Sequence, residues 1–324
     1  MQLSPLADFY RSHGGTLAPY RGSLSRQDGG EPALLGPGWP AAQLVLYDLS
    51  WRAVLAIEGP EARKWLNGML TANVRDLEPG QLAPSFQLDP KGHVLAMLDV
   101  ACTGPEQFLL LTEEDQRAGL EARLRRYVFI AKLTIEDRSP EWCGLRLRGP
   151  RWRALWEQLQ LPVERRWVSA PGGVEQAEWA GPAAEVAALW RRLQPAALAA
   201  GSAVFERDRI LSRQPAYGRD IGERELPQET GEMERVSFTK GCYVGQEIVE
   251  RIRARGAVHR RLRAMRFDSA VAPDAEVCAG GRPAGALTSA VPLEDGAWMA
   301  LGYLRDAAPG AAVTSAGADG VVLE

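Results

Sequence analysis

The feature that most constrains the fold is a short sequence pattern that occurs twice. The pattern LAIEGPEARKWL at residues 55–66 returns as LRLRGPRWRALW at residues 145–156. In each copy an apolar run reaches a Gly-Pro pair, and a segment with apolar residues at helical spacing follows. Gly-Pro ends a strand, and proline suits the first turn of a helix. We therefore predict two strand–turn–helix units that arose by internal duplication, which is one source of two-fold α+β architectures.

Between the two copies, a pair of apolar runs favours a β-hairpin. Pro84–Leu88 and His93–Ala101 are separated by the tetrapeptide DPKG at residues 89–92. Proline at the second position and glycine at the fourth fit a type I turn. Elsewhere the pattern predicts a helix capped by Thr112 and another helix over Ala183–Leu193.

The two ends of the chain differ in character from this middle part. Ser4 to Ser12 predicts a short helix capped by Ser4, and Gly22–Pro40, rich in Gly, Pro and Ser, predicts a long loop. After residue 256, short strand-like runs alternate with turn residues, which is typical of a small antiparallel barrel or sandwich. We expect three regions: an N-terminal segment over 1–40, an α+β region over 41–255, and a barrel domain over 256–324.

Composition excludes several classes of protein. A net charge of −3 gives no global attraction for nucleic acid, so any such partner must meet a local patch. No run approaches the roughly 18 apolar residues of a membrane span, and no secretory signal is visible. The four cysteines and the three histidines are scattered, which argues against a disulfide framework and against a zinc site. These properties suit a protein of the reducing cytoplasm with no membrane partner and no resident metal.

One octapeptide, KGCYVGQE at residues 240–247, carries unusual chemistry. Its glycines, Gly241 and Gly245, permit positive φ and close backbone approach. The charge of Lys240 would favour the thiolate of Cys242, which is the reactive form of cysteine. The alternative is that Cys242 is a small buried hydrophobic residue, the commonest fate of a free cysteine.

KGCYVGQE fits the signature of the YgfZ-type folate-binding proteins without a mismatch, and the chain resembles that family. The family belongs to the superfamily of the glycine-cleavage T-protein, an aminomethyltransferase, and includes mitochondrial relatives that help to mature iron–sulfur proteins. The segment Tyr217–Ile221 and the C-terminal GALTSAVPLEDGAWMALGYL are similar to the same superfamily. The resemblance implies an α+β fold with two ferredoxin-like halves, a folate-binding cavity at their centre and a β-barrel beside it.

The chain departs from the superfamily at one position that bears on activity. In aminomethyltransferases the hairpin after the first unit carries adjacent aspartates, one of them catalytic. The matching place here holds Ala96 and Met97, and neither can carry a proton or a charge. Asp99 is displaced along the strand by up to ~10 Å. The sequence therefore predicts folate binding without aminomethyl transfer.

The resemblance also implies where tetrahydrofolate, or a one-carbon derivative of it, would bind. Glu229 stands where the family places the acidic residue that holds the pterin, and a carboxylate can accept from the ring N–H and the exocyclic amine at once. Tyr217 and Tyr243 could stack on the rings of the ligand. Further candidate contacts are Gly241, Gly245, Gln246 and Arg251. The alternatives are a surface glutamate and two core tyrosines.

An arginine-rich strip, Arg251–Arg263, follows the octapeptide. Arg251, Arg253 and Arg255 alternate with apolar residues, so a strand would place all three on one face. Such a face is either simply solvated or a site for an anionic partner: a folate polyglutamate tail, tRNA or an acidic client protein.

The resemblance implies a tetrahydrofolate-binding accessory factor in the assembly or repair of iron–sulfur proteins, which supports tRNA modification indirectly. Its partners would be folate and the iron–sulfur proteins or their assembly machinery. Cys242 would be the reactive or cluster-contacting thiol and Lys240 the residue that tunes it, so these two are the catalytic candidates. One cysteine cannot supply four cluster ligands, so any cluster would be transient or shared. The alternatives are a folate-dependent aminomethyltransferase or demethylase, and an RNA-binding module.

Overall fold

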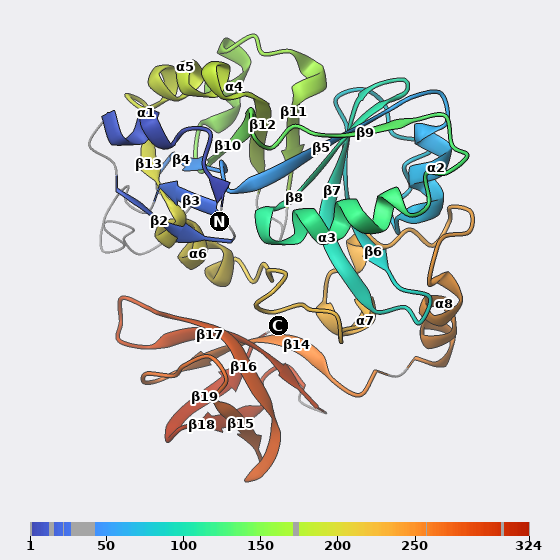
Figure 1. The fold of residues 1–324 in the computed structure, drawn as a ribbon. Coiled ribbons are helices and arrows are strands. Elements are labelled where there is room, and N and C mark those ends of the chain that lie inside the picture. The colour runs from blue at the N-terminus through green and yellow to red at the C-terminus, as the bar shows by residue number, and fades with distance from the viewer. Residues whose placement is uncertain are drawn as a thin grey trace. The chain divides into compact units, whose positions relative to one another are not determined.

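The chain folds into two compact units in the computed structural model, which describes residues 2–12, 16–21, 23–26, 43–170, 175–256, 258–305 and 308–323 (Figure 1). Unit 1 comprises Met1–Ser85, Met97–Glu206 and Ser237–Tyr243. Unit 2 comprises Phe86–Ala96, Arg207–Val236 and Val244–Glu324. Helices and antiparallel strands alternate irregularly along the chain, which confirms the expected α+β class.

The first sheet carries the first copy of the sequence repeat. Its strand order is β6-β7-β8-β5-β9, and β5 pairs antiparallel with both β8 and β9. The strands are β5 Arg52–Glu58, β6 Leu82–Leu88, β7 Val94–Gly104, β8 Gln107–Glu113 and β9 Thr134–Asp137. Helix α2 Ala62–Met69 follows β5, and helix α3 Glu114–Arg125 follows β8. The predicted hairpin is confirmed, since the Asp89 N–H donates to the His93 carbonyl at 3.0 Å across the turn.

The second sheet carries the second copy, and its strand order is β11-β12-β10-β4-β13. The strands are β4 Val45–Asp48, β10 Trp142–Arg148, β11 Arg166–Ser169, β12 Gln176–Pro182 and β13 Leu198–Ala200. The helices are α4 Trp152–Gln158, α5 Ala183–Leu193 and α6 Ser202–Leu211, with a short 3₁₀ turn at Val163–Arg165. Leu145 and Leu147 of β10 pack with Trp156 of α4 and Trp190 of α5 in one buried cluster. Burial of each such side chain stabilises the fold by about 1.5–3 kcal/mol.

A shared steric requirement explains why the Gly-Pro pair occurs in both copies. Gly59 has φ 138°, and a Cβ there would lie 2.4 Å from the carbonyl oxygen of Lys132. Gly149 has φ 112°, and a Cβ there would collide with the carbonyl oxygen of Gln43. In each copy another segment crosses directly over the strand end, so only glycine fits. The proline that follows lies in the turn, and each helix begins two residues later, at Ala62 and Trp152.

The N-terminal part forms a small sheet with the order β1-β3-β2. Its strands are β1 Gln2–Leu3, β2 Leu17–Tyr20 and β3 Ser23–Arg26. Helix α1 Ala7–Ser12 begins three residues later than predicted, while Ser4 Oγ accepts the Leu6 N–H at 3.1 Å just before it. The loop predicted over Gly22–Pro40 is wrong at β3, and the rest of it lies outside the described residues. Thr112 does not cap α3: its hydroxyl donates to the Met97 carbonyl, and Glu113 is the N-cap residue.

The C-terminal strands of unit 2 close into the predicted antiparallel barrel, in the order β14-β17-β16-β15-β18-β19. They are β14 Arg261–Phe267, β15 Glu276–Ala279, β16 Arg282–Pro292, β17 Trp298–Leu304, β18 Ala312–Ser315 and β19 Ala318–Val322. Alternate residues such as Met265, Phe267 and Leu287 fill its interior. The domain boundaries expected at residues 40 and 255 stay predictions.

The segment before the barrel differs from expectation. Alternation predicts a strand through Arg251 and Arg255, whereas the structure has a helix, α8 Gln246–Arg255. The helix lies between two left-handed glycines, and the Gly256 N–H donates to the Ile252 carbonyl as a C-cap. Its buried Val249 and half-buried Ile252 are three residues apart, which is a helical spacing. Gln, Glu and Arg are good helix formers, so propensity and capping outweigh a short alternation. Unit 2 also contains helix α7 Pro227–Thr230 and a 3₁₀ turn at Met233–Arg235.

Candidate functional site

The end of the octapeptide packs tightly on the β6–β7 turn. Gly245 has φ 82°, and a Cβ there would lie 2.6 Å from the carbonyl oxygen of Asp89. From the other side, a Cβ on Gly92 of the turn would come within 3.0 Å of the Ile248 side chain of α8. Gly241 differs from the sequence prediction, because it is not left-handed and no atom lies within 4 Å of a Cβ built there. Of the two glycines, Gly245 therefore needs to be glycine for steric reasons, and Gln246 directly after it begins α8.

Lys240 and Cys242 have opposite environments. Lys240 is buried, and its Nζ donates to the carbonyl oxygens of Leu70 and Ala72 at 2.5 and 2.6 Å. Burial lowers the pKa of Lys240 to about 7. The ammonium also lies 5.0 Å from the ring centroid of Tyr243, which is itself buried. Cys242 is exposed, so the interpretation of this thiol as a core residue is wrong.

The contacts of Lys240 fix the first residue of the octapeptide in place. A buried amine with two carbonyl acceptors anchors residue 240 to the segment after α2, and its hydrogen bonds span 170 and 168 residues of sequence. Two of the three ammonium protons are thereby directed to the backbone. The arrangement can therefore present a solvent-accessible thiol on a turn whose backbone is held in place. The expectation that the charge of Lys240 favours the thiolate form of Cys242 stays a prediction.

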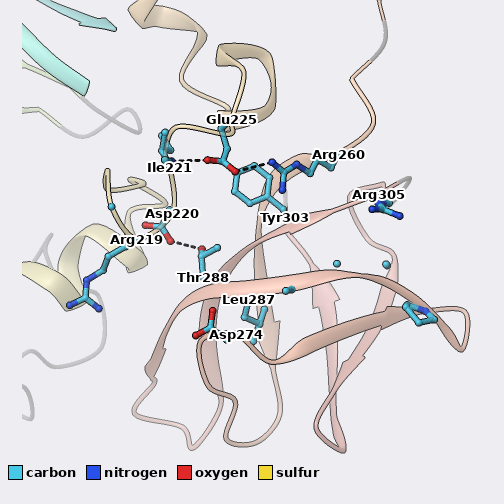
Figure 2. A pocket seen from close by; sticks show the side chains of 16 residues that line it. Arg219, Asp220, Ile221, Glu225, Arg260, Asp274, Leu287, Thr288, Tyr303 and Arg305 are labelled. Carbon is cyan, nitrogen blue, oxygen red and sulfur yellow. Dashed lines mark hydrogen bonds and ion pairs between the residues drawn. The ribbon is translucent and has the colours of Figure 1, made fainter. Parts of the chain in front are cut away.

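In unit 2, one arginine bridges two buried or half-buried carboxylates, and Figure 2 shows it beside the first of them, Glu225. Arg260 Nη2 lies 2.8 Å from Glu225 Oε1, and Arg260 Nε lies 3.3 Å from Glu229 Oε1. The second oxygen of Glu225 accepts the Gly222 N–H, and that of Glu229 accepts the Leu226 N–H. Glu229 is only 8% exposed, so the interpretation of it as a surface glutamate is wrong. The pair of carboxylates stabilises the guanidinium charge where solvent is partly excluded.

A pocket of about 560 Å³ adjoins this cluster in unit 2. Residues 218–222, Glu225 and Arg260 line one side of it, and residues 283–288 of β16 and Tyr303 of β17 line the other. Figure 2 shows the Tyr303 ring beneath Arg260, whose guanidinium carbon lies 4.6 Å from the ring centroid. Burial raises the pKa of the Tyr303 phenol, and its hydroxyl has no hydrogen-bond partner among the described residues. The size suits a small organic ligand, and the lining offers acceptors, a cation and a buried hydroxyl.

Asp220 holds the loop of this pocket onto the barrel. Its carboxylate accepts hydrogen bonds from Arg209 at 2.7 Å and from Ser289 of β16 at 2.7 Å. Thr288 donates to the same carboxylate, as Figure 2 shows. Asp220 is almost fully buried, and Arg209 beside it compensates its charge. The loop that lines the pocket is thus fixed by a satisfied polar network.

Tyr217 and Tyr243, the two aromatic candidates, are placed differently. Tyr217 is half-buried, and its hydroxyl donates to the Leu95 carbonyl of β7 at 2.9 Å. This bond orients the ring next to the strand that includes Ala96. Tyr243 is 7% exposed and packs with Lys240 in unit 1. Stacking of either ring on a folate stays a prediction.

The aspartate nearest to the superfamily's catalytic position is committed to an ion pair. Asp99 Oδ2 lies 2.6 Å from Arg52 Nη2, and Arg52 Nη1 lies 2.8 Å from Glu178 Oε2. Ala96 is fully buried and Met97 is half-buried on β7. Ala96 and Met97 therefore carry no acidic group, and Asp99 on the same strand is paired with Arg52.

The arginine strip does not form one surface. Arg251, Arg253 and Arg255 are exposed on α8, and Arg253 lies 3.3 Å from Glu250. Arg260 is turned toward its two carboxylates, and Arg266 pairs with Asp295. Arg251 and Arg255 are four residues apart on the helix and so share a face. The prediction that Arg251, Arg253 and Arg255 lie on one face of a strand is wrong. On α8, Arg251 and Arg255 together form an exposed basic patch.

Sequence reasoning missed three residues of the pocket. Glu225 and Arg260 appear in the sequence only as members of an acidic and a basic stretch, and their pairing joins positions 35 residues apart. Tyr303 lies in a barrel strand whose alternation gives no sign that its hydroxyl is isolated. The only sequence signal for the ion pair is that Glu225 and Arg260 have opposite charges. Charge alone does not show which acidic residue pairs with which arginine.

Within the described ranges, no group of three or more His, Cys, Asp and Glu side chains could hold a metal ion. In the same ranges no helix has the length and apolar character needed to cross a membrane.

Comparison with known proteins finds one matching family and several similar individual proteins. Residues 41–166 match the family described as GCVT N-terminal domain. The tRNA-modifying protein YgfZ of Escherichia coli O157:H7 is 27% identical over 272 residues, which cover 78% of this chain and 83% of that protein. The mitochondrial iron–sulfur cluster assembly factor IBA57 homolog of Neurospora crassa is 27% identical over 240 residues. That match covers 67% of this chain and 52% of the Neurospora protein, so the chain spans about half of its length.

The fold has a solved counterpart. The glycine cleavage system aminomethyltransferase T from Bartonella henselae superposes with a TM-score of 0.86, covering all of this chain and 97% of that chain at 19% identity. At this identity the match shows that the architecture is shared and leaves the activity open.

Proposed function

Because the chain is a YgfZ-type member of the GCVT superfamily, we propose that it binds tetrahydrofolate, or a one-carbon derivative, and serves the assembly or repair of iron–sulfur proteins. Support for tRNA modification would follow indirectly, through iron–sulfur enzymes that modify tRNA. A cytoplasmic location is part of this proposal. The observation that carries it is the exposed Cys242 thiol two residues from the buried Lys240, whose ammonium is bound to two backbone carbonyls of unit 1.

A thiol in this position suits a transient task rather than a resident cluster. Cys242 is solvent-accessible, so a partner protein can reach it, and a single cysteine leaves the remaining cluster ligands to that partner. By contrast, Cys102 and Cys143 are buried, and burial raises the pKa of Cys143 well above its ordinary value. We propose that Cys242 contacts the client or its cluster and that Lys240 positions it.

Two groups of unit 2 support the folate part of the proposal. A carboxylate oxygen has two lone pairs, so Glu229 Oε1, with one contact to Arg260 at 3.3 Å, keeps acceptor capacity for a pterin N–H. The isolated Tyr303 hydroxyl is a second group that a polar ligand would satisfy. We propose Glu229, with Tyr217, as pterin contacts, and Gly245, Gln246 and Arg251 as neighbours of the bound ligand. Tyr243 and Gly241 belong to the same proposal, near the thiol.

The aminomethyltransferase alternative gains no support from the site. Ala96 is buried and carries no acidic group, and Asp99 on the same strand is engaged by Arg52, which weighs against the reaction. We propose that folate acts here as a bound effector or as a donor to a partner enzyme.

Complementation in a deletion strain tests the thiol. Cys242→Ser should fold normally yet leave iron–sulfur enzyme activities low, because the hydroxyl is neither a cluster ligand nor a nucleophile of comparable strength. Cys278→Ser is the matched control, since Cys278 is half-buried in the barrel and unrelated to the octapeptide. Full activity with Cys242→Ser would refute the role of the thiol.

A further inference from the structure

The loop between α3 and β9 in unit 1 displays three large apolar side chains to solvent. Tyr127, Phe129 and Ile130 are 56%, 86% and 94% exposed, and we call them the apolar tip. Single exposed apolar residues are ordinary on a protein surface, but three within four residues of one loop are unusual. Among the other described residues, Val163 and Val168 are the most exposed large apolar side chains, at 54% and 50%.

Helix α2 fixes the backbone on both sides of the apolar tip. Trp65 Nε1 donates to the Tyr127 carbonyl at 3.1 Å, and the Lys132 N–H donates to Glu61 Oε2 at 2.6 Å. The loop is therefore held in one shape while Phe129 and Ile130 project from it. A surface that is ordered before binding loses less conformational entropy when a partner docks.

Positive charge surrounds the apolar tip. Lys64, Arg126 and Lys132 are exposed, and within the part of the chain that the structure describes none of them forms an ion pair. We call these three residues the basic rim. The nearest carboxylate along α3, Glu121, is already paired with Arg125 at 2.8 Å. Glu61, whose carboxylate accepts the Lys132 N–H, is another carboxylate beside the loop, so the three cations of the rim still exceed it in charge.

We propose that the apolar tip and the basic rim dock a partner protein that presents an apolar pocket bordered by carboxylates. An apolar centre inside a charged rim is the usual anatomy of a protein interface, and its small extent suits a transient contact. A membrane surface is the main competing occupant, and photocrosslinking distinguishes it, because a membrane would give adducts to lipid instead of protein. A single-stranded nucleic acid fits less well, because Ile130, the most exposed of the three, has no π-face on which a base could stack.

This surface uses no residue of the thiol or folate sites, so the inference stands apart from the proposed function. The test begins with the full chain carrying p-benzoylphenylalanine in place of Phe129, expressed in cells that lack the native copy and then irradiated. A discrete protein adduct is expected, absent when the same group replaces Val168. Adducts to lipid or RNA alone, or no adduct, would overturn the proposal.

The adduct protein is then purified, and its affinity for the chain is measured by calorimetry. Phe129→Ser/Ile130→Ser should weaken binding about tenfold or more. Arg126→Glu/Lys132→Glu should weaken it as well and flatten its dependence on salt. Val163→Ser/Val168→Ser, the matched control for exposed apolar residues, should bind like the wild type. Equal affinities for the wild type and the first two variants would overturn the proposal.

Discussion

Gly245 packs directly on Asp89: a Cβ at residue 245 would lie 2.6 Å from the Asp89 carbonyl oxygen, and φ at Gly245 is 82°. Two independent constraints, steric contact and left-handed backbone, thus fall on one glycine of the octapeptide. The other glycine, Gly241, is under neither constraint.

The first prediction uses this difference. Gly245→Ala should lower the free energy of unfolding by at least about 1–2 kcal/mol, because alanine is strained in the left-handed region and its Cβ displaces the hairpin turn. Gly241→Ala should change it by only a few tenths of a kcal/mol, about the scatter of surface substitutions. Urea unfolding of both variants measures the two values. Equal destabilisation would mean that the octapeptide is not held against the turn.

The second prediction concerns Lys240, whose pKa burial lowers from 10.5 to about 7. Between these values the unfolded chain binds one more proton than the folded chain, so the free energy of unfolding rises with pH. The slope approaches ~1.4 kcal/mol per pH unit. The stability that Lys240 contributes is therefore lost as the pH falls through the folded-state pKa of about 7. Lys240→Met should remove this component of the profile, whereas Lys91→Met, at an exposed lysine of the hairpin turn, should keep it. Parallel profiles for wild type and Lys240→Met would contradict the assignment.

The fold could be predicted where the determining pattern is local. The Gly-Pro repeat predicts both strand–turn–helix units because Gly59 and Gly149 face the same steric demand from a crossing segment. The hairpin after β6 follows from its turn residues, and α5 follows from its apolar spacing. Helix α8 was missed because five residues of alternation are too few to outweigh helix propensity and two glycine caps.

The candidate site could be predicted only in part, because its key contacts are long-range. The octapeptide identifies Lys240 and Cys242, but nothing local shows that Leu70 and Ala72 would be the acceptors for Lys240. The sequence likewise places Arg260 in a basic strip, while in the structure the nearest opposite charges are those of Glu225 and Glu229. Pairings of this kind depend on how distant segments pack and leave no periodic trace in the sequence.

The third prediction addresses the basic face that α8 retains. Arg251→Ser/Arg255→Ser should weaken binding of tRNA or of a polyglutamylated folate if that face binds an anion. For tRNA, removal of each arginine–phosphate interaction should flatten the slope of log affinity against log salt by roughly 0.7–0.9, the values for single strands and for B-DNA. Arg282→Ser, at an exposed barrel arginine, is the control. Unchanged affinity at both low and high salt would mean that the face is merely solvated.

The fourth prediction is the absence of aminomethyl transfer with the glycine-cleavage partner proteins. By the resemblance drawn from the sequence, Ala96 and Met97 stand where the superfamily has acidic residues, and in the structure Asp99 is held by Arg52 at 2.6 Å. A coupled assay with a genuine T-protein as positive control measures the rate. Turnover comparable with that control would refute the prediction and favour the transferase alternative.

The central claim is that this chain binds reduced folate through Glu229, and calorimetry with tetrahydrofolate tests it most directly. The wild type should bind, and Glu229→Gln should bind at least about tenfold more weakly. The glutamine amide carries no charge, so one charge-assisted hydrogen bond is lost, and its NH₂ group would face the N–H donors of the pterin. Glu223→Gln, at an exposed glutamate of the same loop, should bind like the wild type. Absence of binding by the wild type, or equal affinity for wild type and Glu229→Gln, would contradict the account.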